Sequence, residues 1–266
     1  MPFTNSVLIK ENTGINCSTV TIRRRLHGDG VHARSPARKI SLSPAHAAER
    51  LRFCRENLDR DWSNVIFSDE KTFTSSQDRP IRIVWRRDNT RYNMEHVLPN
   101  RSSGRISLGF WGWMSDSGPG ELIQVSPPRF NAHAYVRLLE EVMLPTVRAL
   151  YPEDEHEEVV FVQDNCSIHT AHIVRDWFED NPSIRLLNWP SKSPDLDPIE
   201  NIWSQMILNW QDPFYGVRNR APDLLRGEAI AVWERMRGRE LCQNMVAGMR
   251  NRLQECIDAN GYHTSY

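Results

Sequence analysis

The order of apolar runs and helical stretches constrains the fold of this chain more than any other feature. Strands are expected where β-branched and aromatic residues cluster, and helices where apolar residues recur at helical spacing. The expected series is three strands, a helix, a strand, a helix, a strand and a helix, in chain order residues 65–67, 81–85, 106–111, 131–150, 158–163, 171–178, 184–187 and a helix beginning near residue 198. This order predicts an α/β domain with a mixed sheet flanked by helices.

Length and composition are those of an ordinary globular protein. With 266 residues, of which 39% are hydrophobic and 25% charged, the chain can bury one sizeable core and a small satellite domain. No apolar run approaches the roughly 18 residues that a membrane span needs, and the opening residues 1–5 lack the layout of a signal peptide. We therefore expect an intracellular protein without a membrane segment.

The cysteines indicate neither a disulfide framework nor a zinc ribbon. There are five of them, an odd number, and none forms a Cys-x-x-Cys motif. Cys166 and His169 form a Cys-x-x-His pair, but no second pair completes a tetrahedral zinc site. A packed or hydrogen-bonded histidine is the favoured interpretation of His169.

The charge is distributed unevenly along the chain. The net charge is −1, but the first 60 residues hold 11 lysines and arginines against 5 acids, a balance of +6 that leaves −7 for the remainder. A basic front end suggests an arm that contacts nucleic acid, and an acidic body suggests carboxylates that bind cations. Chance clustering of charge is the alternative.

The N-terminal segment has the pattern of a helix, a turn centred on Gly14 and a second helix that Asn16 or Ser18 can cap. Ile22 and Leu26 share the inner face of the second helix, as in the recognition helix of a helix-turn-helix module. A solvated amphipathic helix with an arginine-rich outer face fits the segment equally well.

A basic linker and a further helix follow. Residues 31–42 predict an extended segment able to follow a phosphate backbone, with a plain hinge as the alternative. Ser43 and Pro44 predict the start of a helix, as cap and first helical residue. The candidate DNA-binding residues of the recognition helix and linker are Ser18, Thr19, Thr21, Arg23, Arg24, Arg25, Arg34, Arg38 and Lys39.

Three acids lie at the ends of expected elements. Asp69 and Asp164 each end an apolar strand, and Glu200 lies in the first turn of a helix. If the two strands are neighbours, the two aspartates converge. Because side chains alternate along a strand, Asp69 and Glu70 point to opposite faces and cannot easily serve one site. Two or three such carboxylates suit Mg²⁺ or Mn²⁺, which take their remaining ligands from water and phosphate.

Each acid also has a purely structural interpretation. Asp69 can simply end a strand, and Asp164 with Asn165 can form a turn whose side chains bond nearby backbone. Residues 197–200 can be a capping box in which Glu200 bonds back to the amide of Asp197. The spacing alone favours capping and metal binding equally for Glu200.

At these acids the sequence resembles the Tc1/mariner family of transposases, most closely its Tc1-like branch. Thirty-five residues separate Asp164 from Glu200, close to the family's usual gap, and a glutamate as the final acid favours the Tc1-like branch. Together with segments between the catalytic blocks, the resemblance covers most of residues 15–210. The blocks are IFSDEKTF at 66–73, QDN at 163–165 with HT at 169–170, and WPSKSPDLDPIENIW at 189–203.

The resemblance implies an RNase H-like catalytic domain that hydrolyses phosphodiesters at element ends and joins the freed 3′-hydroxyl to target DNA. Asp69, Asp164 and Glu200 would be the catalytic triad and would hold two Mg²⁺ or Mn²⁺ ions. Double-stranded DNA is the implied partner, a homodimer is compatible with the family, and the nucleus is the implied location in a eukaryotic host. No membrane partner is expected.

We accordingly expect four parts: a partial helix-turn-helix module at 1–30, a basic linker and helix at 31–60, the catalytic domain at 61–210 and a helical C-terminal tail at 211–266.

Three features depart from the family. Only the second half of a bipartite helix-turn-helix region is expected, the body is acidic, and Asp197 replaces a common asparagine. The alternatives are an inactive, truncated or domesticated DNA-binding protein and another metal-dependent nuclease of RNase H-like fold.

Overall fold

The computed structural model describes residues 5–32, 39–74, 106–125, 130–152, 158–210, 221–237 and 240–266. The chain divides into two compact units, Met1–Ile40 and Ser41–Tyr266. The strand expected at residues 81–85 lies outside the described residues, as do Arg34 and Arg38.

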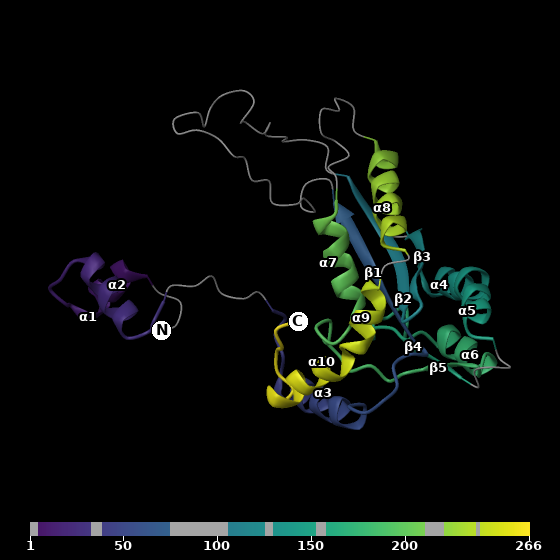
Figure 1. The fold of residues 1–266 in the computed structure, drawn as a ribbon, viewed down its shortest axis with the longest axis horizontal. Helices are drawn as coiled ribbons and strands as arrows, with labels where there is room; N and C mark the ends of the chain where they lie inside the picture. Colours follow the sequence, from purple (N-terminus) through teal and green to yellow (C-terminus); the bar gives the residue numbers. More distant parts are fainter. Residues whose placement is uncertain are drawn as a thin grey trace. The chain divides into compact units, whose positions relative to one another are not determined.

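The first unit contains two helices, α1 (Ser6–Thr13) and α2 (Thr19–Gly28). Gly14 ends α1 with a φ of 64°, a left-handed conformation that glycine adopts at little cost. The Thr21 amide donates a 3.1 Å bond to the Ser18 hydroxyl, so Ser18 rather than Asn16 is the cap of α2. The predicted helix, glycine turn and second helix are therefore present (Figure 1).

The second unit is built on a five-stranded mixed sheet of order β3-β2-β1-β4-β5. The strand β1 pairs antiparallel with β2 and parallel with β4, so it occupies the centre of the sheet. The other pairs are β2 with β3, antiparallel, and β4 with β5, parallel. The strands are β1 (Val65–Thr74), β2 (Ser107–Ser115), β3 (Gly118–Val125), β4 (Val159–Val162) and β5 (Ile184–Leu186).

The strand β3 was not predicted from the sequence. The strand opens with Gly118-Pro119-Gly120, residues that argue against a strand because they lack either a side chain or an amide donor. Here β3 forms a hairpin with β2 at the edge of the sheet. Gly120 is required because a Cβ atom there would lie 1.9 Å from the ring of Trp113.

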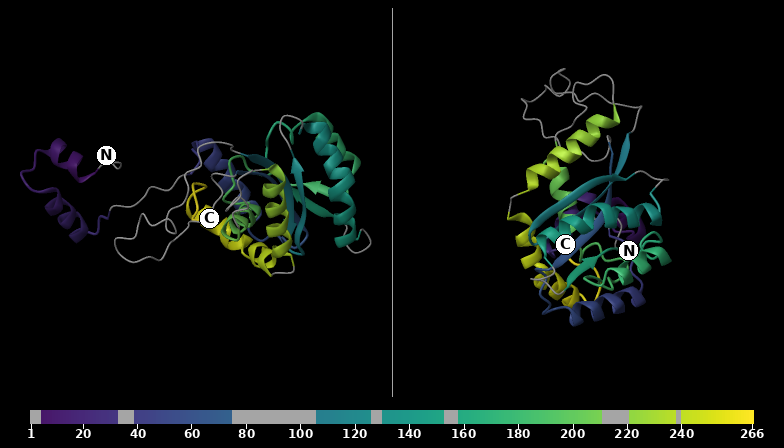
Figure 2. Two further views of the ribbon diagram at one scale, coloured as in Figure 1. Left: turned by 90° about the horizontal axis from the view of Figure 1, so that it is seen from above. Right: turned by 90° about the vertical axis from the view of Figure 1, so that its right-hand side faces the viewer.

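Helices cover both faces of the sheet, as Figures 1 and 2 show. On one face α4 (Ala132–Leu138), a π-helical turn (Leu139–Met143), α5 (Leu144–Leu150) and α6 (His172–Asp180) share a core with Ile66. On the other face Val65 and Phe67 belong to a core that includes side chains of the remaining helices. These helices are α3 (Pro44–Glu56), α7 (Ile199–Leu208), α8 (Pro222–Met236), α9 (Leu241–Ala247) and α10 (Met249–Asp258).

The C-terminal helices share the core that contains Phe67 and α7. Trp233 of α8 is fully buried and tilts against Trp203 of α7, with ring centroids 5.4 Å apart. Leu253 of α10 is also fully buried in the same core as Phe67. No helix in the described part of the chain is long and apolar enough to cross a membrane.

Candidate active site

Asp69 lies within β1, and Asp164 lies just beyond the end of the neighbouring strand β4. The expectation that Asp69 ends its strand is wrong, because β1 continues to Thr74 through its pairing with β2. The last parallel pair between β1 and β4 joins Phe67 to Val162, so each aspartate lies two residues beyond that pair. Phe67 and Val162 face the same core, the one that contains α7. The neighbouring strands on which the predicted convergence depends are thus present.

Asp69 lies in a partly buried, negatively charged environment beside α7. Its Oδ2 accepts a 2.9 Å hydrogen bond from the indole Nε1 of Trp203. Burial raises the pKa of Asp69 to about 7, and the negative charges of Glu200 and Glu70 add to the shift. In the described part of the chain no lysine or arginine pairs with Asp69 or Glu200. A bound cation would therefore relieve unfavourable charge here.

Glu200 does not close the capping box that its spacing permits. The helix α7 begins at Ile199, and the Ile199 amide donates a 3.1 Å bond to Oδ1 of Asp197. Within the described residues, the Glu200 carboxylate makes no bond back to the Asp197 amide. The capping interpretation of Glu200 is wrong, because the side chain that bonds a first-turn amide is that of Asp197. The Glu200 carboxylate instead contributes to the electrostatics of Asp69.

Asp197 is a fourth acid at this site that the sequence analysis noted only as a departure from the family. Its side chain is buried, and it is 7% exposed as a residue. Burial raises the pKa of Asp197 well above its usual value, and the charges of Asp69 and Glu200 raise it further. The sequence signal that could have identified it is its position at the start of the helix that carries Glu200.

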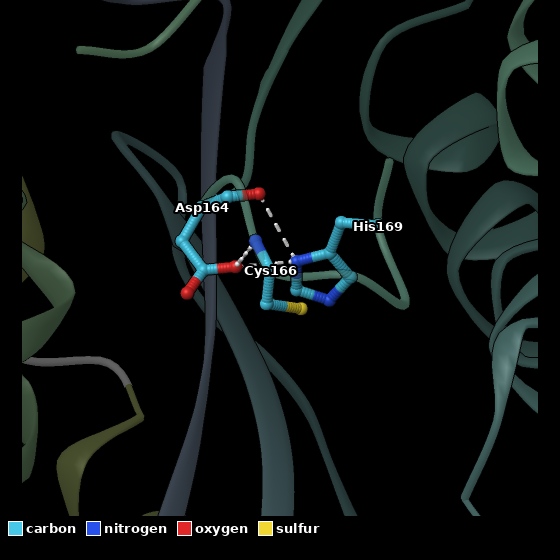
Figure 3. Close-up of side chains that lie close together, drawn as sticks. All are labelled: Asp164, Cys166 and His169. Carbon is cyan, nitrogen blue, oxygen red and sulfur yellow. Dashed lines mark hydrogen bonds and ion pairs between the residues drawn. The ribbon is translucent and has the colours of Figure 1, made fainter. Parts of the chain in front are cut away.

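Asp164 has a different environment. Its side chain is 59% exposed, and its Oδ1 accepts a 2.9 Å bond from the Cys166 amide, which is the turn that the structural interpretation predicted. The same oxygen lies 2.7 Å from Nδ1 of His169. Figure 3 shows the two side chains facing each other. This bond to His169 is the largest of the causes that lower the pKa of Asp164 to about 2.

His169 connects Asp164 to Glu70. The imidazole is almost wholly buried, with its Nε2 3.0 Å from Oε1 of Glu70 and its ring 4.4 Å from that of Tyr135. Burial lowers the pKa of His169, but the charge of Tyr135 and hydrogen bonds to Asp164, Cys166 and Glu70 raise it by more. The interpretation of His169 as a hydrogen-bonded histidine is confirmed. Asp69 and Glu70 accordingly bond to different elements, as strand alternation predicts.

A buried ion pair anchors the loop that leads to Glu200. Arg50 of α3 is fully buried and donates two 2.7 Å bonds to the carboxylate of Asp195. Arg252 of α10 donates to the Asp195 carbonyl and to the Asn201 side chain, each at 2.7 Å. The loop before α7 and the first turn of α7 are therefore held by α3, from the beginning of the unit, and by α10, from its end. This network was not predicted because its members are far apart in the chain.

The predicted DNA-binding residues that the structure describes in the first unit differ in their exposure and partners. Ser18 and Thr21 are engaged with each other in the cap of α2, with their hydroxyl oxygens 2.9 Å apart. Arg23, Arg24 and Arg25 are exposed on α2. Lys39 is exposed in the linker, and Thr19 is half-buried.

Two family models match the chain. The model described as "DDE superfamily endonuclease" matches residues 64–219, and one described as "Transposase", of the Tc3 helix-turn-helix type, matches residues 2–59. The first match contains β1 through α7 and all three acids of the site.

Curated relatives are similar along nearly the whole chain. The Tcb1 transposase of Caenorhabditis briggsae is 32% identical, covering 92% of this chain and 87% of the relative. The Tc1 transposase of Caenorhabditis elegans is 31% identical with the same coverage, and the Tc3 transposase of that organism is 30% identical over 97% of this chain and 75% of the relative.

Solved structures share the fold. A Mos1 transposase paired-end complex with the left transposon end matches 98% of this chain and 76% of that chain, with a TM-score of 0.73 and 19% identity. The catalytic domain of Mos1 mariner transposase matches 86% of this chain and all of that domain, with a TM-score of 0.62 and 18% identity. The RNase H-like fold expected from the resemblance is confirmed. By its family-model match and its relatives, this chain belongs to the Tc1/mariner family of transposases and carries a DDE superfamily endonuclease domain.

Proposed function

We propose that this protein is a cut-and-paste DNA transposase in which Asp69, Asp164 and Glu200 hold the divalent cations, Mg²⁺ or Mn²⁺, of a two-metal site. The observation that carries the proposal is the environment of Asp69, a partly buried carboxylate whose pKa is raised to about 7 by burial and by the neighbouring acids. Such a cluster of carboxylates costs stability unless a cation is present, and carboxylate oxygens are the ligands that both ions prefer.

The proposed reaction is cleavage of a phosphodiester at an element end, followed by attack of the freed 3′-hydroxyl on a phosphodiester of target DNA. Two cations in such a site activate the attacking oxygen and stabilise the leaving oxygen in an in-line displacement. The chain itself supplies carboxylates at fixed positions. Trp203 orients Asp69, His169 orients Asp164, and the Arg50–Asp195 pair fixes the approach to Glu200.

We assign DNA binding to the first unit and to the linker that follows it. Exposed Arg23, Arg24 and Arg25 on α2 supply the positive charge that contacts with phosphates require. Ser18 contributes to the module mainly as the cap of the recognition helix. Residues 1–30 would serve as a partial DNA-binding module, 31–60 as linker and helix, 61–210 as the catalytic part, and 211–266 as a helical extension that completes its core.

The family suggests the biological setting. The Mos1 structures include complexes described as paired-end, which supports a dimer of this chain on two transposon ends. Mos1 complexes with Mn and with Mg support both cations as candidates. In a eukaryotic host, the nucleus is where such a DNA substrate lies.

The first experiment is calorimetric titration of the purified chain with Mn²⁺ and Mg²⁺, followed by a nicking assay on DNA that carries candidate element ends. We expect binding and nicking in the wild type, and loss of both in Asp69→Asn, Asp164→Asn and Glu200→Gln. Asp180→Asn, an exposed acid at the end of α6, is the matched control and should retain both activities.

Three kinds of result would contradict the proposal. Nicking that persists in all three variants would remove the acids from catalysis. DNA binding without any Mn²⁺ or Mg²⁺ binding would support an inactive DNA-binding protein, and hydrolysis without strand joining would support a nuclease other than a transposase.

A further inference from the structure

We propose that Asp164, Cys166 and His169 form a second kind of metal site, one that binds a thiophilic divalent cation of the Zn²⁺ type. Each of the three side chains offers one ligand atom, and these atoms all lie within 4.8 Å of one another. Figure 3 shows the three side chains gathered in the loop that follows β4. The sequence offered only the Cys-x-x-His pair, and the fold adds a carboxylate as third ligand.

The donor set differs in kind from that of the proposed magnesium site. A thiolate, an imidazole nitrogen and a carboxylate oxygen are the ligands that Zn²⁺ takes in proteins, whereas Mg²⁺ prefers oxygen alone. Three protein ligands leave the fourth tetrahedral position of Zn²⁺ to water. When the ion binds, the Cys166 thiol loses its proton and Nδ1 of His169 carries none, while Nε2 keeps its proton.

Local hydrogen bonds hold the loop in shape before any ion arrives. The Cys166 amide donates to Oδ1 of Asp164 at 2.9 Å, which brings the two residues together in a turn. The Thr170 amide and hydroxyl both donate to the Cys166 carbonyl at 3.0 Å. The side chain of Gln163 donates to the His169 carbonyl at 3.3 Å. Because the backbone is already fixed, the side chains need only small movements to surround a cation.

Glu70 accepts a hydrogen bond from the ring nitrogen of His169 that does not face the site. Nδ1 of His169 faces Asp164 at 2.7 Å, whereas Nε2 lies 3.0 Å from the Glu70 carboxylate. Metal-bound histidines in proteins almost always donate their other ring nitrogen to such a partner, which fixes the orientation of the ring. The His169 side chain is only 1% exposed, so packing also prevents rotation away from the site. Cys166 is half-buried and Asp164 is exposed, which leaves a path for an ion.

The two metal sites share Asp164. A Zn²⁺ ion held by Asp164, Cys166 and His169 removes that carboxylate from the Mg²⁺ or Mn²⁺ pair, so zinc inhibits catalysis. Zinc also binds nitrogen and sulfur donors more tightly than manganese does. This inhibition rests on the proposed function, but zinc binding itself does not.

The test uses the full chain, reduced and freed of metals, with Co²⁺ as a coloured substitute for Zn²⁺. We expect one thiolate-bound Co²⁺ per chain, seen as a near-ultraviolet thiolate-to-cobalt absorption band, and displacement of this cobalt by Zn²⁺. Cys166→Ser should abolish the band, and Cys17→Ser, which changes a half-buried cysteine of the first unit, should retain it. Glu70→Ala should keep the band but weaken Zn²⁺ binding roughly 10- to 100-fold.

Absence of the band in the wild type, or its persistence in Cys166→Ser, would overturn the proposal. Equal Zn²⁺ affinity in wild type and Cys166→Ser would do the same. In the nicking assay, Zn²⁺ should inhibit the wild type at concentrations at least about tenfold lower than those that inhibit Cys166→Ser, because the variant lacks the thiolate ligand. If no nicking is detected at all, the proposed function fails while the cobalt spectrum still decides the metal site.

Discussion

Asp69→Asn should stabilise the metal-free protein at the same time as it abolishes metal binding. The folded protein raises the pKa of Asp69 from 3.8 to about 7. Since the folded pKa lies above the unfolded one, ionisation of Asp69 opposes folding. The cost is absent below about pH 4, grows as the pH rises towards 7, and is complete above it. An asparagine avoids this cost, and its side-chain oxygen can still accept the bond from Trp203.

The size of the effect follows from the shift. A pKa difference of about 3 between the folded and unfolded protein corresponds to roughly 4 kcal/mol of folding free energy, at about 1.36 kcal/mol for each pKa unit. Partial exposure of Asp69 to solvent reduces this value, and we take about half, or roughly 2 kcal/mol. For a unit of this size, each kcal/mol shifts the melting temperature by about 2–4 °C. The variant should therefore melt about 4–8 °C above the wild type at pH 8.

The assay is thermal unfolding followed by circular dichroism in the presence of a chelator, at pH 8 and near pH 4. The difference between variant and wild type should be large at pH 8 and nearly vanish near pH 4. Asp180→Asn, a surface carboxylate of the same unit, should stay within about 0.5 kcal/mol of the wild type at both pH values. A variant that melts at or below the wild-type temperature at pH 8 would refute the reasoning.

Four further predictions concern other parts of the molecule. His169→Asn should weaken Mn²⁺ binding roughly 10- to 100-fold in calorimetry, because it breaks the hydrogen bond that orients Asp164; an unchanged dissociation constant would contradict this role. Arg50→Met should lower the free energy of unfolding in urea by about 3–5 kcal/mol, because it leaves a buried carboxylate without its partner; a decrease below about 1 kcal/mol would show that the ion pair is dispensable. Asp197→Asn should raise the melting temperature at neutral pH, since the pKa of this acid is raised and ionisation of a buried acid opposes folding; a lower melting temperature would mean that its charge is needed. Alanine at residues 23–25 should reduce the slope of log affinity for DNA against log salt concentration by about 0.9 for each phosphate that the variant no longer neutralises; an unchanged slope would exclude these arginines from the interface.

The sequence alone predicted the features that depend on local physics. Strand alternation placed Asp69 and Glu70 on different faces, and the structure bonds them to Trp203 and His169 respectively. The caps at Ser18 and Ser43 were predicted because a hydroxyl reaches an amide only three residues away. These interactions lie within one turn or one strand, so short sequence patterns encode them.

Tertiary structure decided the interactions that join distant segments. The edge strand β3 forms although its Gly and Pro residues have a low preference for strands. Pairing with β2 and packing of the Trp113 ring compensate for this low preference. His169 meets Glu70 across 99 residues, and Arg50 meets Asp195 across 145. Such pairs depend on strand order and helix placement, and no local pattern contains either. The sequence thus determined which acids follow which apolar runs. The assembled sheet determined that β1 continues past Asp69 and which partners each acid has, since side chains meet only where the chain has already folded.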